Sequence, residues 1–284
     1  MNIKRPLYNY KPSKQFKSMN SNLSQIEQKI VDDLSNNGIS IVHFDDLFPD
    51  LDFNKIKQLS EDELSKSDNA DLIAQAKKGL SEGRGKFYNV QFWNQKENLD
   101  NNDLTDILLN ESVIKIASTY LRSICKLYYI DLWYNIPTEG ESILSQNWHR
   151  DPDDRNCVKV FLYLNDVDVD MGSLSYIPKS PYGNKYGKVF PRGPPNQKSS
   201  PPKDVDAKFD GQQITLPGPA GTLVFVDTTG LHKGGHSKTK PRYVLNACFR
   251  SNGSYFRYTD EHKRTISKYK TSNFSSDLVK YAIT

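Results

Sequence analysis

Cysteines and long apolar runs are scarce in this sequence. Its 284 residues include three cysteines, Cys125, Cys157 and Cys248, which form no CxxC pair and give no sign of a disulfide framework or a zinc site. No apolar run approaches the roughly 18 residues of a membrane-spanning helix, and the first residues lack the apolar segment of a secretory signal. We therefore expect a cytoplasmic protein with buried free thiols and no membrane contact.

The charge is nearly balanced, with 38 basic and 34 acidic residues, and the mean hydropathy of −0.68 is that of a soluble globular protein. Residues 1–20 hold five basic residues and no acidic one. They lack the interleaved aromatics of a single-strand nucleic-acid platform and any recognisable DNA-binding motif. We expect residues 1–20 to be a basic, flexible tail and the protein to bind no nucleic acid. The sequence leaves the oligomeric state open.

The first half of the chain has a helical pattern interrupted by short strands. Apolar residues at three- and four-residue steps predict a helix from Asn22 to the stop signal at Gly38, followed by a strand over 39–44 and further helix. A second strand is expected over 86–93, and a helix over 105–124 with a break near Asn110.

From Lys126 onward, short β-rich runs separated by turn residues predict an all-β sandwich or barrel. The runs are KLYYIDLWYNI, VKVFLYLNDV, SLSYIP, QQITL, GTLVFVDT and YVLNACFR. Seven of the fifteen prolines lie within 191–219, which predicts a long surface loop. We expect one domain over 21–284, with helices packed on an all-β core (α+β).

Three of the five histidines fall in two clusters, NWHRD and GLHKGGH. His149 and Asp151 have the spacing that turns two side chains to the same side of a strand end. His232 follows the run GTLVFVDT and is expected at another strand end. His236 is the alternative candidate for the third metal ligand. Two histidines and one carboxylate form the facial triad typical of non-haem Fe(II) sites that react with oxygen.

Arg242 opens the last β-rich run, ten residues after His232. On a neighbouring strand it is expected to bind a carboxylate through both arms of its guanidinium group.

With these motifs the chain resembles the phytanoyl-CoA dioxygenase family of Fe(II)- and 2-oxoglutarate-dependent oxygenases, from about Leu23 to Phe249. The resemblance rests on NWHRDPDDRNCVKVFLYLNDVDVDMGSLSYIPKSP, on Gly221-Thr222-Leu223, on Leu231-His232-Lys233-Gly234-Gly235 and on the spacing of Arg242. It departs from the family at Lys179-Ser180-Pro181, where Gly-Ser-His is common, and at Gly234, where a polar residue is common.

The resemblance implies a double-stranded β-helix, the cupin-like jelly roll. It implies that His149, Asp151 and His232 are catalytic iron ligands, and that Arg242 binds the far carboxylate of 2-oxoglutarate. Asn135 falls where some members place a polar side chain near this cosubstrate. The implied cofactors are Fe(II), 2-oxoglutarate and O2, and the implied reaction is a hydroxylation of a small-molecule substrate with release of succinate and CO2.

The resemblance also bears on the outcome, because related halogenases have a small residue where this chain has Asp151, so the carboxylate favours hydroxylation or a related oxidation. Because a reactive oxidant must be shielded from solvent until the substrate binds, we expect 191–219 to act as a lid. The sequence does not select the substrate, nor which of five side chains faces it, namely Arg150, Arg155, Lys159, Tyr182 and Lys185. The alternatives are a cupin-like metal-binding isomerase and a non-catalytic binding module.

Overall fold

The computed structural model describes residues 5–19, 22–83, 85–93, 103–191, 202–254 and 269–284. Its helices are α1 (Arg5–Ser18), α2 (Gln25–Asn37), α3 (Phe44–Leu47), α4 (Phe53–Ser65), α5 (Ser67–Ser81), α6 (Asp103–Leu108), α7 (Glu111–Leu121), α8 (Val205–Lys208) and α10 (Asp277–Ala282), with 3-10 turns η1 (Gly85–Tyr88), η2 (Leu144–Gln146) and η3 (Thr271–Asn273). Its strands are β1 (Ile39–His43), β2 (Asn89–Gln91), β3 (Lys126–Asn135), β4 (Cys157–Tyr163), β5 (Ser175–Tyr176), β6 (Ile214–Thr215), β7 (Thr222–Val226), β8 (His232–Lys233) and β9 (Arg242–Arg250).

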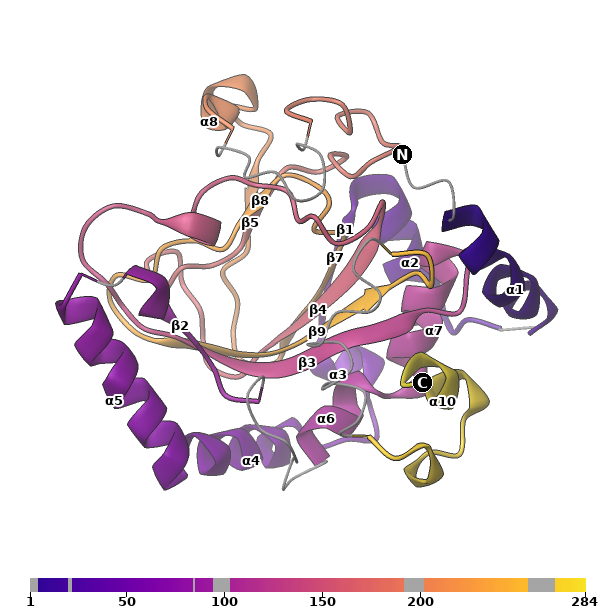
Figure 1. Cartoon of the computed structure of the whole chain (residues 1–284), viewed down its shortest axis with the longest axis horizontal. Coiled ribbons are helices and arrows are strands. Elements are labelled where there is room, and N and C mark those ends of the chain that lie inside the picture. Colours follow the sequence, from indigo (N-terminus) through magenta and orange to yellow (C-terminus); the bar gives the residue numbers. More distant parts are fainter. Residues whose placement is uncertain (1–4, 20–21, 84, 94–102, 192–201, 255–268) are drawn as a thin grey trace.

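Two antiparallel sheets form the centre of the molecule. The larger has the strand order β1-β7-β4-β9-β3-β2, and the smaller has the order β6-β5-β8. In Figure 1, β5, β8 and α8 lie on one side of the larger sheet, and α4, α6 and α10 lie on the other. The predicted all-β core with flanking helices is confirmed.

Successive side chains along a strand point to opposite faces of the larger sheet, so one face packs in the hydrophobic core and the other lines a pocket. Val160, Leu245 and Phe225 point into the main hydrophobic core with the helices. Their neighbours, including Lys159, Phe161 and Trp133, line a pocket on the opposite face. The period of two therefore places charged and aromatic side chains between the sheets.

The entry into the sheet follows the predicted helix-to-strand pattern. Helix α2 begins with a capping box between Ser24 and Glu27 and ends at Gly38, which has a φ of 83°. A Cβ atom at Gly38 would lie 2.3 Å from the Tyr176 hydroxyl, so both the turn and the packing require glycine. The predicted break near Asn110 is also present, since the Asn110 side chain caps α7 by accepting from Ser112 N at 2.9 Å.

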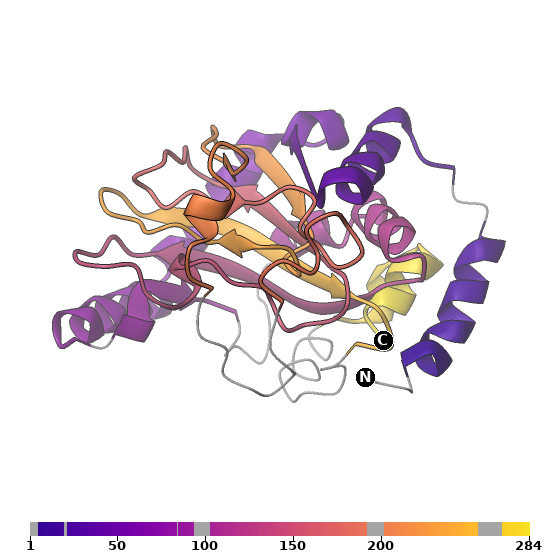
Figure 2. The same ribbon diagram turned by 90° about the horizontal axis from the view of Figure 1, so that it is seen from above.

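Several elements differ from the expectation. Residues Arg5–Ser18, expected in a flexible tail, form α1, and Arg5 pairs with Asp154 at 2.9 Å; the flexibility itself stays a prediction. Helices α1 and α5 lie at opposite ends of the molecule (Figure 2). The segment expected as a loop over 191–219 contains α8 and β6, while its residues 192–201 lie outside the described part of the chain.

The three cysteines are buried free thiols, as expected. Among the described residues, no helix has the length and apolar character needed to cross a membrane.

Candidate active site

Backbone hydrogen bonds bring the two histidine clusters together. His149 N donates to His232 O at 2.8 Å, and His232 N donates to His149 O at 3.0 Å, so the first cluster extends the smaller sheet beside β8. Asp151 N donates to Thr228 O at 2.9 Å. Segments about eighty residues apart in the chain are thereby fixed in one register.

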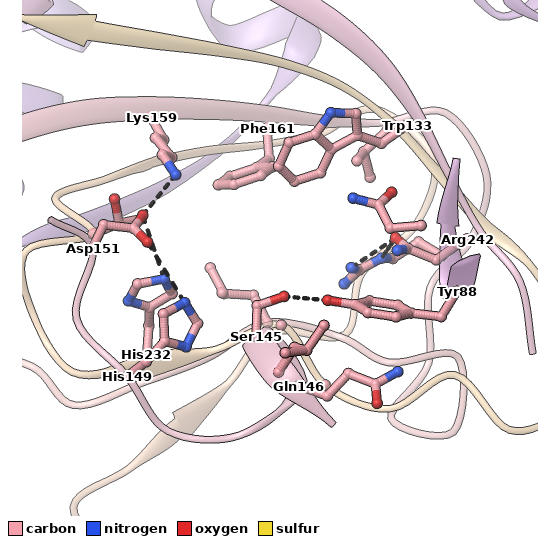
Figure 3. Close-up of a pocket in the computed structure, with 18 of the residues that line it drawn as sticks. Tyr88, Trp133, Ser145, Gln146, His149, Asp151, Lys159, Phe161, His232 and Arg242 are labelled. Atoms are coloured by element: carbon pink, nitrogen blue, oxygen red, sulfur yellow. Dashed lines mark hydrogen bonds and ion pairs between the residues drawn. The ribbon is translucent and has the colours of Figure 1, made fainter. Parts of the chain in front are cut away.

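The side chains of His149, Asp151 and His232 converge at the end of the pocket (Figure 3). One potential ligand atom from each lies within 4.8 Å of the others. His149 Nε2 is 3.6 Å from Asp151 Oδ1, and His232 Nε2 is 3.7 Å from Asp151 Oδ2. The structure thus brings together the three residues predicted to bind iron.

The other ring nitrogens orient both histidines. His149 Nδ1 lies 2.8 Å from Asn147 O, and His232 Nδ1 lies 3.0 Å from Gly230 O. Because a carbonyl oxygen can only accept, each Nδ1 carries a proton, which leaves each Nε2, the nitrogen on the Asp151 side, as the one available to a metal ion. This tautomer is the one that binds a metal ion, so the donor set fits Fe(II).

The electrostatics of the site also suit a metal ion. Burial, helped by the nearby His149 ring, lowers the pKa of His232 to about 3, which keeps its imidazole neutral. Burial raises the pKa of Asp151, but the neighbouring groups, Lys159 first among them, together outweigh this effect, so this pKa lies well below its ordinary value. The site therefore offers a carboxylate and a neutral His232 imidazole to a metal ion, with the His149 ring beside them.

Arg242 lies at the opposite end of the same pocket (Figure 3). Its Nη2 and Nε donate to Asn135 Oδ1 at 2.9 and 3.2 Å, and its Nη1 donates to Gly172 O. Both acceptors are neutral, and burial lowers the pKa of Arg242. Among the described residues, the acceptors of this part-buried guanidinium include no carboxylate, so a bound carboxylate would supply an anionic partner.

The pocket between the triad and Arg242 has a volume of about 400 Å³. Trp133 and Phe161 form an aromatic wall, with ring centroids 6.1 Å apart. Tyr88 and Ser145 lie on the side of the pocket opposite this aromatic wall, with their hydroxyls 2.5 Å apart (Figure 3). Amide side chains complete the lining, namely those of Asn89, Gln91, Asn135 and Gln146.

Of the five side chains left undecided by the sequence, Lys159 lines this pocket. Its position could have been inferred, because it is the charged residue in the apolar run of β4 and alternation places it on the same face as Phe161.

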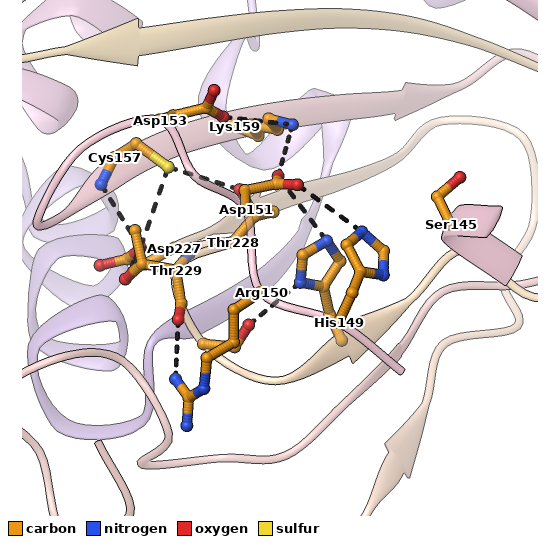
Figure 4. A network of polar contacts seen from close by, with 12 residues as sticks. Ser145, His149, Arg150, Asp151, Asp153, Cys157, Lys159, Asp227, Thr228 and Thr229 are labelled. Atoms are coloured by element: carbon orange, nitrogen blue, oxygen red, sulfur yellow. Dashed lines mark hydrogen bonds and ion pairs between the residues drawn. The ribbon is translucent and has the colours of Figure 1, made fainter. Parts of the chain in front are cut away.

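Arg150 points away from the pocket and binds backbone instead (Figure 4). Its guanidinium donates five hydrogen bonds to main-chain carbonyls, those of Ser180, Tyr186, Val189, Phe190 and Thr229. This residue stands between two triad members, so it ties them to the loops behind the site.

Asp227 organises the turn that positions His232, a role for which the sequence alone offers no signal. This buried carboxylate accepts from Tyr120 Oη at 2.7 Å, from Asn156 Nδ2 at 2.8 Å and from Thr229 N at 2.9 Å. His236, the competitor of His232, lies apart from the triad, with Nε2 2.7 Å from Thr138 Oγ1.

Similar solved structures share this fold at low sequence identity. EctD from S. alaskensis, solved with 2-oxoglutarate and 5-hydroxyectoine, has a TM-score of 0.56 and 14% identity over 82% of this chain and 78% of that chain. EvdO2 from Micromonospora carbonacea var. aurantiaca has a TM-score of 0.52 and 16% identity over 81% and 93%. The epimerase SnoN, solved with Fe3+, alpha ketoglutarate and nogalamycin RO, has a TM-score of 0.50 and 16% identity over 83% and 87%. These likenesses confirm the predicted jelly roll.

Among curated proteins no match was found. The model of the phytanoyl-CoA dioxygenase (PhyH) family matches residues 55–242, more than half of the chain and a shorter span than the resemblance suggested. The matched span contains His149, Asp151 and His232 and ends at Arg242. The chain therefore belongs to the phytanoyl-CoA dioxygenase family of enzymes.

Proposed function

We propose that this protein is an Fe(II)- and 2-oxoglutarate-dependent dioxygenase that hydroxylates a C–H bond of a small molecule. The observation that carries the proposal is one pocket with a His-Asp-His triad at one end and Arg242 at the other. Within the described part of the chain the hydrogen-bond acceptors of Arg242 are neutral, and 2-oxoglutarate has the two carboxylates that such a site requires.

His149, Asp151 and His232 would hold the iron, and Arg242 would bind the far carboxylate of 2-oxoglutarate. When bound, iron and 2-oxoglutarate supply the activation of O2, in which 2-oxoglutarate becomes succinate and CO2 while the substrate gains a hydroxyl group. Asn135 would orient Arg242, since its Oδ1 accepts from both Nε and Nη2.

The substrate is a small molecule on this proposal, because a pocket of about 400 Å³ must also hold the cosubstrate. Trp133 and Phe161 offer an apolar surface to it, and amide side chains offer hydrogen bonds. Two cationic side chains line the pocket. Lys159 is paired with Asp151, and Arg242 would bind 2-oxoglutarate. Nothing in the lining thus selects an acyl-CoA, despite the family name.

The carboxylate of Asp151 as the third group of the triad favours hydroxylation or a related oxidation over halogenation. The same group disfavours a cupin-like isomerase, for which three histidines and a glutamate would be typical. SnoN, an epimerase, has the same fold, so the gain of an oxygen atom by the substrate is the result that distinguishes hydroxylation.

The experiment measures succinate formed from 2-oxoglutarate by the purified protein, with Fe(II) and O2 present, as candidate small molecules are added. We expect succinate to form only when iron and oxygen are both supplied, and a true substrate to raise its rate and to gain one oxygen atom by mass. Asp151→Ala should lower the rate at least 100-fold, because the triad loses its carboxylate.

Lys233→Met is the matched control, since Lys233 follows His232 in the chain but pairs with Asp206 at 3.5 Å. Its rate should equal that of the wild type. Equal succinate formation by Asp151→Ala would contradict the proposed function and favour a non-catalytic binding module.

A further inference from the structure

Lys159 is a buried lysine in the functional pocket. It lies on β4, whose backbone is paired on both sides, with Lys159 opposite Val226 of β7 and opposite Cys248 of β9. The residue is 9% exposed. Because the backbone of Lys159 is held in the centre of the sheet, the fold sets where its side chain begins and which face of the sheet it enters.

The ammonium group of Lys159 binds one oxygen of the triad carboxylate (Figures 3 and 4). Nζ is 2.6 Å from Asp151 Oδ2 and 3.8 Å from Asp153 Oδ2. Asp151 Oδ1 lies 3.6 Å from His149 Nε2, and Asp151 Oδ2 lies 3.7 Å from His232 Nε2. The two oxygens of Asp151 are thus distinguished by their surroundings.

A second buried ion pair keeps Lys159 in place. Arg250 Nη2 lies 2.5 Å from Asp153 Oδ1, so Asp151, Lys159, Asp153 and Arg250 form a chain of alternating charge. Within this chain each neighbour is of opposite sign, and a swing of the ammonium away from Asp151 would break an ion pair of 2.6 Å. Removing one member of a buried pair is costly for that reason.

We propose that Lys159 is a positioning residue that holds Asp151 Oδ2, so that Asp151 offers a single oxygen to the metal ion. A carboxylate that binds through one oxygen leaves more coordination positions open than one that binds through two. Those positions are the ones that 2-oxoglutarate and O2 require. This inference rests on the proposed function and assigns the lysine a task in metal geometry, not in binding an anionic substrate.

The test uses Co(II) in place of Fe(II), because its visible spectrum reports coordination number without turnover. The full-length wild type and Lys159→Met are loaded with Co(II) without oxygen, and 2-oxoglutarate is then titrated in. We expect Lys159→Met to change the Co(II) spectrum before any 2-oxoglutarate is added, and to weaken 2-oxoglutarate binding at least tenfold, because both oxygens of Asp151 become available to the metal.

Two further variants keep the test decisive. Lys159→Arg retains a donor for Asp151 Oδ2, so it should recover most of the wild-type spectrum, and it carries the decision if circular dichroism shows that Lys159→Met does not fold. Lys233→Met, the lysine beside His232, should match the wild type in both measurements.

A wild-type Co(II) spectrum and wild-type 2-oxoglutarate affinity in Lys159→Met would overturn the inference and leave the proposed function standing. The same holds if Lys159→Met binds the cosubstrate normally but loses affinity only for an anionic substrate, because the lysine would then be a substrate anchor. Failure of the wild type to bind Co(II) and 2-oxoglutarate would overturn both.

Discussion

Arg150 shows how one residue between two triad members stabilises the site without entering it. Its five hydrogen bonds reach the carbonyls of two loops, 180–190 and the turn at Thr229 that precedes His232. Burial lowers the pKa of Arg150 to about 10, and carbonyl oxygens compensate for the lost water. Its planar group satisfies all five acceptors at once, which a lysine cannot do.

Arg150→Lys should therefore destabilise both the fold and the metal site. Hydrogen bonds to charged groups contribute about 1.5–3 kcal/mol each but do not add, so we expect a loss of about 2–4 kcal/mol in the free energy of unfolding. Co(II) affinity should fall at least tenfold, because His149 and Asp151 flank the residue. Urea denaturation and metal titration measure the two effects.

Arg155→Lys provides the control for that substitution. Arg155 is exposed and stacks its guanidinium 4.4 Å from the Tyr182 ring centroid. It should change neither quantity measurably. Equal behaviour of the two variants would contradict the structural role given to Arg150.

The residues of the site could be predicted to different degrees. His149, Asp151 and His232 were found from short spacings, and the structure brings all three together with Arg242 facing them across the pocket. Lys159 lay on a strand whose period assigns a face, whereas Arg150 lies in an irregular segment, where no period tells which way a side chain points. Asp227 was missed because a buried aspartate after a strand has no local signature.

At the scale of elements, segments with a clear apolar pattern could be predicted, whereas α1, a helix of 14 residues, and β8, a strand of two, could not. Helix α7 and strands β3, β4, β7 and β9 carry clear periodicity. Strand β8 has two residues, His232 and Lys233, and exists because the backbone of His149 pairs with it. Because such a short strand forms only by pairing with a distant segment, the sequence predicted His232 at a strand end but not its pairing with His149.

Helix α10 was not predicted either, and its attachment to β3 makes a testable contact. Lys126 Nζ donates to Tyr281 O at 2.5 Å and to Thr284 Oγ1 at 3.3 Å. Burial lowers the pKa of Lys126 to about 8 from an ordinary value of 10.5. The folded chain therefore holds fewer protons at this group than the unfolded chain between these two pH values.

The sign of the pH dependence follows from that difference. Between about pH 8 and pH 10.5 the unfolded state binds more protons, so the contribution of Lys126 to the free energy of unfolding increases with pH. One pKa unit corresponds to about 1.4 kcal/mol, and because Lys126 is partly exposed we expect a smaller gain, about 1–2 kcal/mol in all.

Urea denaturation of wild type and Lys126→Met at pH 7.5 and pH 9.5, values chosen to straddle a pKa of about 8, tests this expectation. The difference in free energy of unfolding between the two proteins should shift in favour of the wild type at the higher pH. Lys280→Met, which removes a lysine paired with Asp277 on the same helix, should show no such shift. Parallel pH profiles for wild type and Lys126→Met would contradict the account of this contact.

At the scale of the whole molecule, the jelly roll positions chemistry through its two faces. The helices cover one face of the larger sheet with apolar side chains, which leaves the other face free to carry Lys159, Trp133 and Arg242 toward the smaller sheet. The triad comes from the smaller sheet and its edge, and Arg242 comes from the larger sheet. The pocket therefore exists only when the two sheets are correctly packed.

The central claim is that this one pocket binds Fe(II) and 2-oxoglutarate together, and an anaerobic titration tests it most directly. The measured signal is the weak visible absorption band that arises when 2-oxoglutarate binds Fe(II) through its keto group and near carboxylate. We predict a band that saturates at one iron and one 2-oxoglutarate per chain in the wild type. Asp151→Ala should abolish it by removing a ligand, and Arg242→Ala should require at least tenfold more 2-oxoglutarate. Absence of the band in the wild type with both components in excess would contradict the account, as would a band of equal strength and affinity in both variants.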